Sequence, residues 1–97
     1  MVIGVLQLDL HLHAPHSLKE KRGVVQKLLG RCRSRFPASC AEIGHQDLWQ
    51  RARLGFAVVS TAEQVVAPIL QRIEDELLAS GAGEVDLVEA VIEYIHC

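Results

Sequence analysis

The 97-residue sequence predicts an α+β fold in which two helices cover one face of a four-stranded antiparallel sheet. Apolar and polar residues alternate in two stretches, near the N-terminus and around residue 55, as in strands with one buried face. Two Ser-x-x-Glu capping boxes each precede an apolar stripe at helical spacing. The resulting order β-α-β-β-α-β, with right-handed crossovers, predicts the ferredoxin-like arrangement with strand order 4-1-3-2.

The first strand and helix are predicted from the N-terminal third of the chain. Pro15 ends a strand in which two sets of residues alternate, Val2, Leu6, Leu8, Leu10 and Leu12 on one side and Ile3, Val5, Gln7, Asp9, His11 and His13 on the other. The capping box from Ser17 to Glu20 predicts a helix that starts at Leu18. Pro37 then stops the helix.

The remaining elements follow from the same rules. Ser39 to Ile43 is predicted as a short strand, and alternation returns from Gln50 to Ser60. Ser60 to Glu63 is the second capping box, so the second helix should follow it. Pro68 removes a hydrogen bond inside that helix, and we expect a kink near residues 64–67 or a late start. Glu84 to Ile95 is predicted as the last strand.

Composition limits the class of protein. Apolar residues make up 49% of the chain, charged residues 23%, and the net charge is −2, which excludes a disordered tail, a collagen-like repeat and a histone-like protein. No apolar run approaches the roughly 20 residues of a transmembrane helix, and no signal-peptide pattern is present. We therefore expect one cytoplasmic domain over residues 1–97, without a membrane partner. Three cysteines without CxxC spacing predict free thiols at Cys32, Cys40 and Cys97.

The sheet face that the helices leave uncovered is predicted to be apolar and to form a homodimer interface, with the residues Ile3, Val5, Ala57 and Val59. The last strand is apolar at both parities, with Val85, Leu87, Val91 and Ile95 on one side and Val88, Ala90, Ile92 and Tyr94 on the other. A strand that is apolar on both faces is usually covered on both faces. The alternative is an isolated patch of the size that monomers tolerate.

Charge is distributed unevenly along the chain. Nine of the ten cationic residues fall between positions 19 and 53, and eight of the twelve acids fall between positions 63 and 93. Cations crowd the first turn of the first helix, where the helix dipole disfavours them. We predict a phosphate-binding surface for RNA or a ribosomal subunit, formed by Ser17, Lys19, Lys21, Arg22, Arg51 and Arg53. The alternative is a solvated charge run that pairs with Glu20 and the acidic second helix.

The loops after the first two strands should meet at one end of the sheet, because those strands are parallel. The second loop contributes four further candidates, His45, Gln46, Asp47 and Trp49. A small-anion binder or an enzyme that uses His45 and Asp47 is the competing class, and a purely structural protein-interaction dimer is a third. No nucleophile or Gly-rich phosphate loop accompanies these residues, so we expect no catalytic residue and no cofactor. Trp49 is predicted to begin the third strand on the uncovered face and to anchor packing at the dimer interface, and a base-stacking platform is the alternative.

A metal site is not predicted from the histidines at the end of the first strand. His11 and His13 share one face of that strand, but the sequence shows no third ligand at a compact spacing. The alternative to a metal site is that they are polar residues that close the end of the strand.

Three segments resemble the YlxP-like family of small bacterial proteins, a family of unknown function. They are VIGVLQLDLHL at the N-terminus, SLKEKR from Ser17 to Arg22, and AEIGHQDLWQRARLGFAVVS from Ala41 to Ser60. The resemblance covers almost the whole chain and implies a ferredoxin-like fold that is commonly dimeric, encoded near translation genes. The HAPH stretch from His13 to His16 departs from the usual form of that loop, which carries no such histidines.

Overall fold

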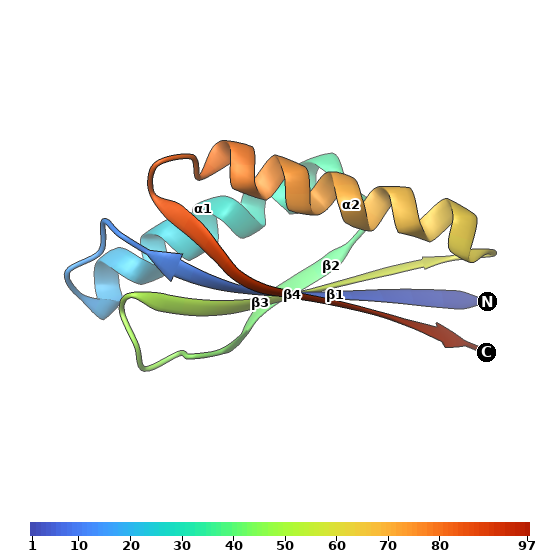
Figure 1. The fold of residues 1–97 in the computed structure, drawn as a ribbon, viewed down its shortest axis with the longest axis horizontal. Helices are drawn as coiled ribbons and strands as arrows, with labels where there is room; N and C mark the ends of the chain where they lie inside the picture. The colour runs from blue at the N-terminus through green and yellow to red at the C-terminus, as the bar shows by residue number, and fades with distance from the viewer.

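Two helices lie on one face of a four-stranded sheet in the computed structural model, which describes residues 1–97 (Figure 1). The elements in chain order are β1 (Val2–Leu12), α1 (Leu18–Arg35), β2 (Ser39–Gly44), β3 (Arg51–Ser60), α2 (Glu63–Ser80) and β4 (Val85–His96). The strand order is β2-β3-β1-β4, and every neighbouring pair is antiparallel. The predicted ferredoxin-like topology is therefore confirmed. Neither helix is long and apolar enough to cross a membrane.

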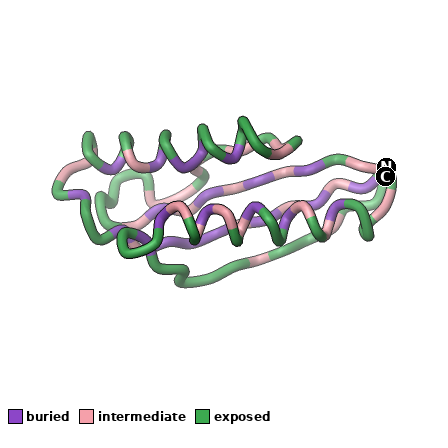
Figure 2. The backbone as a smooth tube through the Cα atoms, turned by 90° about the horizontal axis from the view of Figure 1, so that it is seen from above, coloured by how far each residue is buried: buried purple, intermediate pink, exposed green.

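The core lies between the sheet and the two helices. Alternation in β1 and β3 directs one side of each strand into this layer, including Leu6, Leu8, Leu54 and Phe56. The helix α2 lies directly against β1 at Gly4, where a Cβ atom would collide with Val66. In contrast, β4 is exposed along most of its length, as Figure 2 shows. The helices thus cover the centre of the sheet and leave this edge strand open on both faces.

The two helices begin in different ways. At α1 the capping box is confirmed, because Ser17 Oγ accepts a hydrogen bond from the Glu20 backbone N–H at 3.1 Å. The prediction that Ser60 to Glu63 form a second capping box is wrong. The helix α2 begins at Glu63 itself, after Ala62, and no side chain caps it. The late start expected at Pro68 is also wrong, since α2 runs through this residue. Both Pro68 and Gln64 are exposed, so water can solvate the carbonyl that the proline leaves unpaired.

Two register shifts change which side chains share a face. In β4 the pairing moves from Asp9↔Glu89 to Leu10↔Leu87, so Val88 is an extra residue that has no partner on β1. A second shift in β2 leaves Ile43 as the extra residue. The continuous alternation predicted for the last strand is therefore wrong. Val85 and Leu87 pair with core-facing residues of β1, whereas Val91 and Ile95 pair with residues of the uncovered face.

The uncovered sheet face carries the apolar residues that the sequence predicts for it. Ile3, Val5 and Ala57 are half-buried, and Val59 is 58% exposed. Ile43 and Ile95 extend this apolar area and are about half exposed. Nothing in the chain itself covers the face, because both helices lie on the other side (Figure 1).

Candidate functional site

The loops that follow β1 and β2 meet at one end of the sheet. The Lys21 ammonium donates a hydrogen bond to the backbone carbonyl of His45 at 2.5 Å. The ring centroids of His16 and Trp49 are 6.0 Å apart. The predicted meeting of these loops is therefore confirmed.

Lys21 is buried at this end of the sheet, with 1% of its surface exposed. Its ammonium lies 2.8 Å from Glu42 Oε2, and that oxygen has no hydrogen-bond partner besides this ion pair. Glu42 pairs with core-facing Leu54 and therefore points beneath α1, where Lys21 meets it. The predicted contribution of Lys21 to a phosphate-binding surface is therefore wrong, because its ammonium is buried and paired with Glu42 inside the fold.

Asp9 is the centre of a second charged cluster, on the uncovered face. Its carboxylate is 8% exposed and lies 3.0 Å from Arg51, 3.5 Å from Arg53 and 3.3 Å from His45. Burial raises the pKa of Asp9, but hydrogen bonds and charge from Arg51 and His45 outweigh burial and hold this pKa below its ordinary value. The Arg53 guanidinium also donates a hydrogen bond to the side-chain oxygen of Gln7 and forms an ion pair with Glu89. Both arginines thus have an internal partner in place of a phosphate.

The start of α1 is also occupied. Glu20 Oε2 accepts hydrogen bonds from the backbone N–H of His16 at 2.9 Å and from Ser17 Oγ at 3.3 Å. A carboxylate of the chain therefore sits where a bound anion would accept these hydrogen bonds. The prediction that Ser17 helps to bind phosphate loses its physical basis.

The four loop candidates do not form an acid–base pair. His45 has a positive φ of 58° and directs its ring towards Asp9, not towards Asp47. Gln46 and Asp47 are exposed in the turn. Trp49 is 39% exposed and precedes β3, beside His16, where it packs between two loops and does not begin the strand.

The thiols in the core are held in the protonated form. Burial raises the pKa of Cys32 to about 11, with a smaller contribution from the nearby Cys40 and Glu76. Burial also raises the pKa of Cys40, although the charge of Arg33 opposes it. Because the thiolate is the reactive form, neither cysteine offers a nucleophile at neutral pH.

The outer surface of α1 retains most of its positive charge. Five of the seven cationic residues of this helix have no carboxylate within ion-pair distance; the two that do are Lys21 and Arg35. We call these five residues the α1 basic surface: Lys19, Arg22, Lys27, Arg31 and Arg33. All five are exposed, and only Arg31 and Arg33 donate to neutral oxygens, of Ser80 and Cys40. The predicted pairing of α1 with the acidic α2 is thus limited to Arg35 and Glu76.

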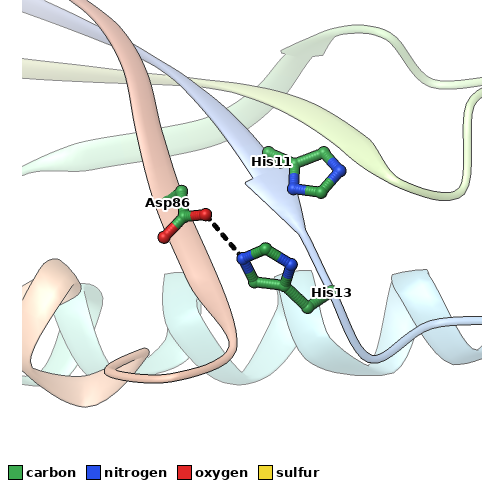
Figure 3. A group of neighbouring side chains, drawn as sticks. All are labelled: His11, His13 and Asp86. Carbon is green, nitrogen blue, oxygen red and sulfur yellow. Dashed lines mark hydrogen bonds and ion pairs between the residues drawn. The ribbon is translucent and has the colours of Figure 1, made fainter.

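The structure also adds a third side chain to the histidine pair. Asp86 at the start of β4 lies beside His11 and His13, as Figure 3 shows. The potential ligand atoms of the three residues lie within 4.8 Å of one another. The sequence shows no third ligand at a compact spacing because Asp86 is 73 residues away from His13, and the fold brings the two together.

The sequence matches a known family over most of its length. The model of the family described as "Protein of unknown function (DUF503)" matches residues 3–91. The chain belongs to this family. A curated member of similar sequence is "Uncharacterized protein YlxP" from Bacillus subtilis (strain 168), which is 39% identical over 72 residues, 74% of this chain and 78% of that protein. The resemblance to the YlxP-like family is confirmed.

Solved structures of low sequence identity share only the fold with this member of the DUF503 family. A "putative Antibiotic biosynthesis monooxygenase" from Chloroflexus aurantiacus J-10-fl is 11% identical and superposes with a TM-score of 0.64 over 98% of this chain and 94% of that chain. The de novo designed protein Foldit4 is 8% identical, with a TM-score of 0.56 over 100% and 99% of the two chains. A fold shared by a natural protein and a designed one does not identify a function, so function must come from the side chains.

Proposed function

We propose that the protein is a non-enzymatic RNA-binding factor that contacts phosphates through the α1 basic surface. The observation that carries this proposal is that five exposed cations of one helix have no carboxylate partner. The side chains of Lys21, Arg51 and Arg53 form ion pairs with carboxylates of the chain itself, so these three residues are not part of the proposed binding surface. Lys19 and Arg22 are the two members that the sequence already predicts.

The shape of the α1 basic surface favours a backbone over an isolated anion. From Lys19 to Arg33 the helix rises about 21 Å, which is long enough to follow several phosphates. Gly23 and Gly30 lie on the exposed side of the helix, and a Cβ atom at either position would meet nothing within 4 Å. Because these two residues have no side chain, the helix backbone between the cations is accessible. An RNA backbone can therefore approach the helix closely.

Structured RNA fits better than a single strand. Base stacking on a sheet needs aromatic residues on its open face. In this protein β1 contains no Phe, Tyr or Trp, and the one aromatic of β3, Phe56, is buried in the core. Recognition by phosphate contacts along a duplex needs no such residues. The acidic residues of α2 and β4 would repel RNA and orient α1 towards it.

The affinity of the purified protein for an RNA hairpin is expected to fall roughly 40- to 150-fold between 50 and 200 mM salt, as for three or four phosphate contacts. We expect R22E to weaken binding several-fold at low salt, because Arg22 is exposed and has no carboxylate partner. Arg72 on α2 is equally exposed and unpaired, so R72E is a matched control that should retain the affinity. Fluorescence anisotropy measures the RNA affinity of the wild type and both variants. Equal losses of affinity in R22E and R72E, or an affinity that does not change with salt concentration, would contradict the proposal.

We further propose that the uncovered sheet face joins two copies of the chain. Support comes from the apolar residues Val59, Ile43 and Ile95 on a face that no element of the chain covers. Two charged residues of this face, Asp9 and Arg53, are paired with each other, so burial against a second copy leaves neither of these two charges unpaired. Glu93, which is opposite Val5 on the edge strand β4, is exposed and belongs to no ion pair.

The variant V59D is expected to convert such a dimer into a monomer, because it places a charge in the apolar contact. Light scattering coupled to size exclusion measures the molar mass. Val65 is 45% exposed on α2, on the other side of the molecule, so V65D is the matched control and should remain dimeric. A wild-type protein that is monomeric at high micromolar concentration would refute the dimer.

A further inference from the structure

We propose that His11, His13 and Asp86 form a binding site for a divalent transition-metal ion of the zinc class. The two histidines lie at the end of β1, and Asp86 lies beside them near the start of β4 (Figure 3). His13 Nε2 and Asp86 Oδ2 are 2.6 Å apart, and the His11 and His13 ring centroids are 4.7 Å apart. Neither the family nor the proposed RNA binding accounts for this cluster.

The geometry is close to that of a bound site. Zinc bonds to nitrogen and oxygen are about 2.0–2.2 Å, so ligand atoms in a tetrahedral site lie about 3.4 Å apart. The three ligand atoms here lie within 4.8 Å of one another. The side chains of His13 and Asp86 are 45% and 67% exposed, so they are free to rotate by the small amount required. An ion can therefore replace the hydrogen bond between them without a change in the backbone.

The β-bulge in β4 positions the third ligand. On the far side of the bulge, Glu89 is opposite Asp9. If Val88 paired with Leu10 and the pairing continued without a bulge, Leu87 would be opposite His11. Because Val88 is left unpaired, Asp86 is opposite His11 and its carboxylate joins the two imidazoles. Bulges commonly redirect a side chain in this way, and here the redirected group is a metal ligand.

The ligand set selects the class of ion. Two imidazoles and one carboxylate suit zinc and its neighbours in the first transition row, whereas magnesium and calcium prefer oxygen ligands alone. Three protein ligands on an exposed surface leave the fourth position of a tetrahedral ion open to water. Arg51, which is opposite His11 in the sheet, directs its guanidinium to Asp9, so its positive charge is partly neutralised there.

A second histidine–carboxylate pair supplies an internal control. His96 Nε2 and Glu63 Oε1 are also 2.6 Å apart and similarly exposed, but they belong to no cluster with a third ligand. If a histidine beside a carboxylate were sufficient for zinc binding, this pair would bind as well. The proposal requires that the His96–Glu63 pair does not contribute to zinc binding.

The test is a calorimetric titration of the full chain with zinc chloride at pH 7.5, in a C97S background that removes the exposed thiol. We expect one ion per chain, with affinity weakened at least 10-fold by H11A and by D86N, and unchanged by H96A. The cobalt(II) form should show visible absorption that both site variants lose. These residues lie at the surface, and circular dichroism verifies that each variant is folded.

Three results would overturn the proposal. The first is a dissociation constant weaker than about 1 mM for the parent protein. The second is an affinity that H11A leaves unchanged, which would reduce the cluster to the His13–Asp86 hydrogen bond. The third is an equal loss in H96A, which would show that zinc binds to surface histidines without preference.

Discussion

Replacement of Lys21 by methionine is expected to destabilise the protein by about 3–5 kcal/mol, because it leaves a largely buried carboxylate without its counter-charge. Lys21 is 1% exposed and the Glu42 side chain is 18% exposed, so little solvent is available to compensate. The His45 carbonyl would lose its hydrogen bond from the ammonium at the same time. Urea unfolding followed by circular dichroism measures the change.

Two further variants separate the lost charge from the lost side chain. K21M combined with E42Q removes both charges, and it should recover a large part of the stability that K21M loses. Lys19 is two residues away on the exposed side of α1, so K19M should change the free energy of unfolding by less than about 0.5 kcal/mol. Equal losses in K21M and K19M would show that the buried ion pair does not contribute.

The variant D9N is expected to lose about 2 kcal/mol of stability at pH 7, since Asp9 accepts charge-assisted hydrogen bonds within a buried cluster. The partners Arg51 and Arg53 are 35% and 26% exposed and can turn partly to water, which keeps the loss below that of K21M. Asp47 is exposed and belongs to no ion pair, so D47N is the matched control with little effect. Urea unfolding at pH 7 compares the three proteins.

The same residue predicts a pH dependence. The pKa of Asp9 is lowered in the folded state, whereas an unfolded aspartate titrates near 3.9. The ionised carboxylate therefore contributes stability above about pH 4, and this contribution is lost as the pH falls through the lowered folded value. Unfolding measured between pH 7 and pH 2 should show wild type and D9N converging in acid. A difference that stays constant over this range would contradict the role of the Asp9 charge.

The fold follows from local patterns that each act over a few residues. Alternation in β1 and β3 selects the buried face of each strand, and Ser17 with Glu20 sets the first residue of α1. These interactions join residues that are close in the sequence, so a single sequence is sufficient to predict them. The prediction failed at α2, where Ala62 precedes the helix and Pro68 is accommodated, because solvent satisfies the groups that the sequence rules expect to be bonded.

The placement of charges depends on contacts between distant residues. The sequence alone determined that α1 is basic and that α2 and β4 are acidic. Only the tertiary structure decided that Lys21 pairs with Glu42 inside the fold while Lys19 and Arg22 remain free. The helical position of Lys21 shows that it faces inwards, but the carboxylate that receives it comes from β2. A lysine without that partner would have to reach water.

The candidate metal site shows the same division most clearly. The sequence alone determined that His11 and His13 lie two residues apart where β1 ends, and residues two apart in a strand point the same way. Only the tertiary structure decided that Asp86 joins them, because a single unpaired residue, Val88, changes the face on which every earlier residue of β4 lies. Side-chain direction in a strand has a period of two, so one extra residue is sufficient to exchange a leucine for a carboxylate.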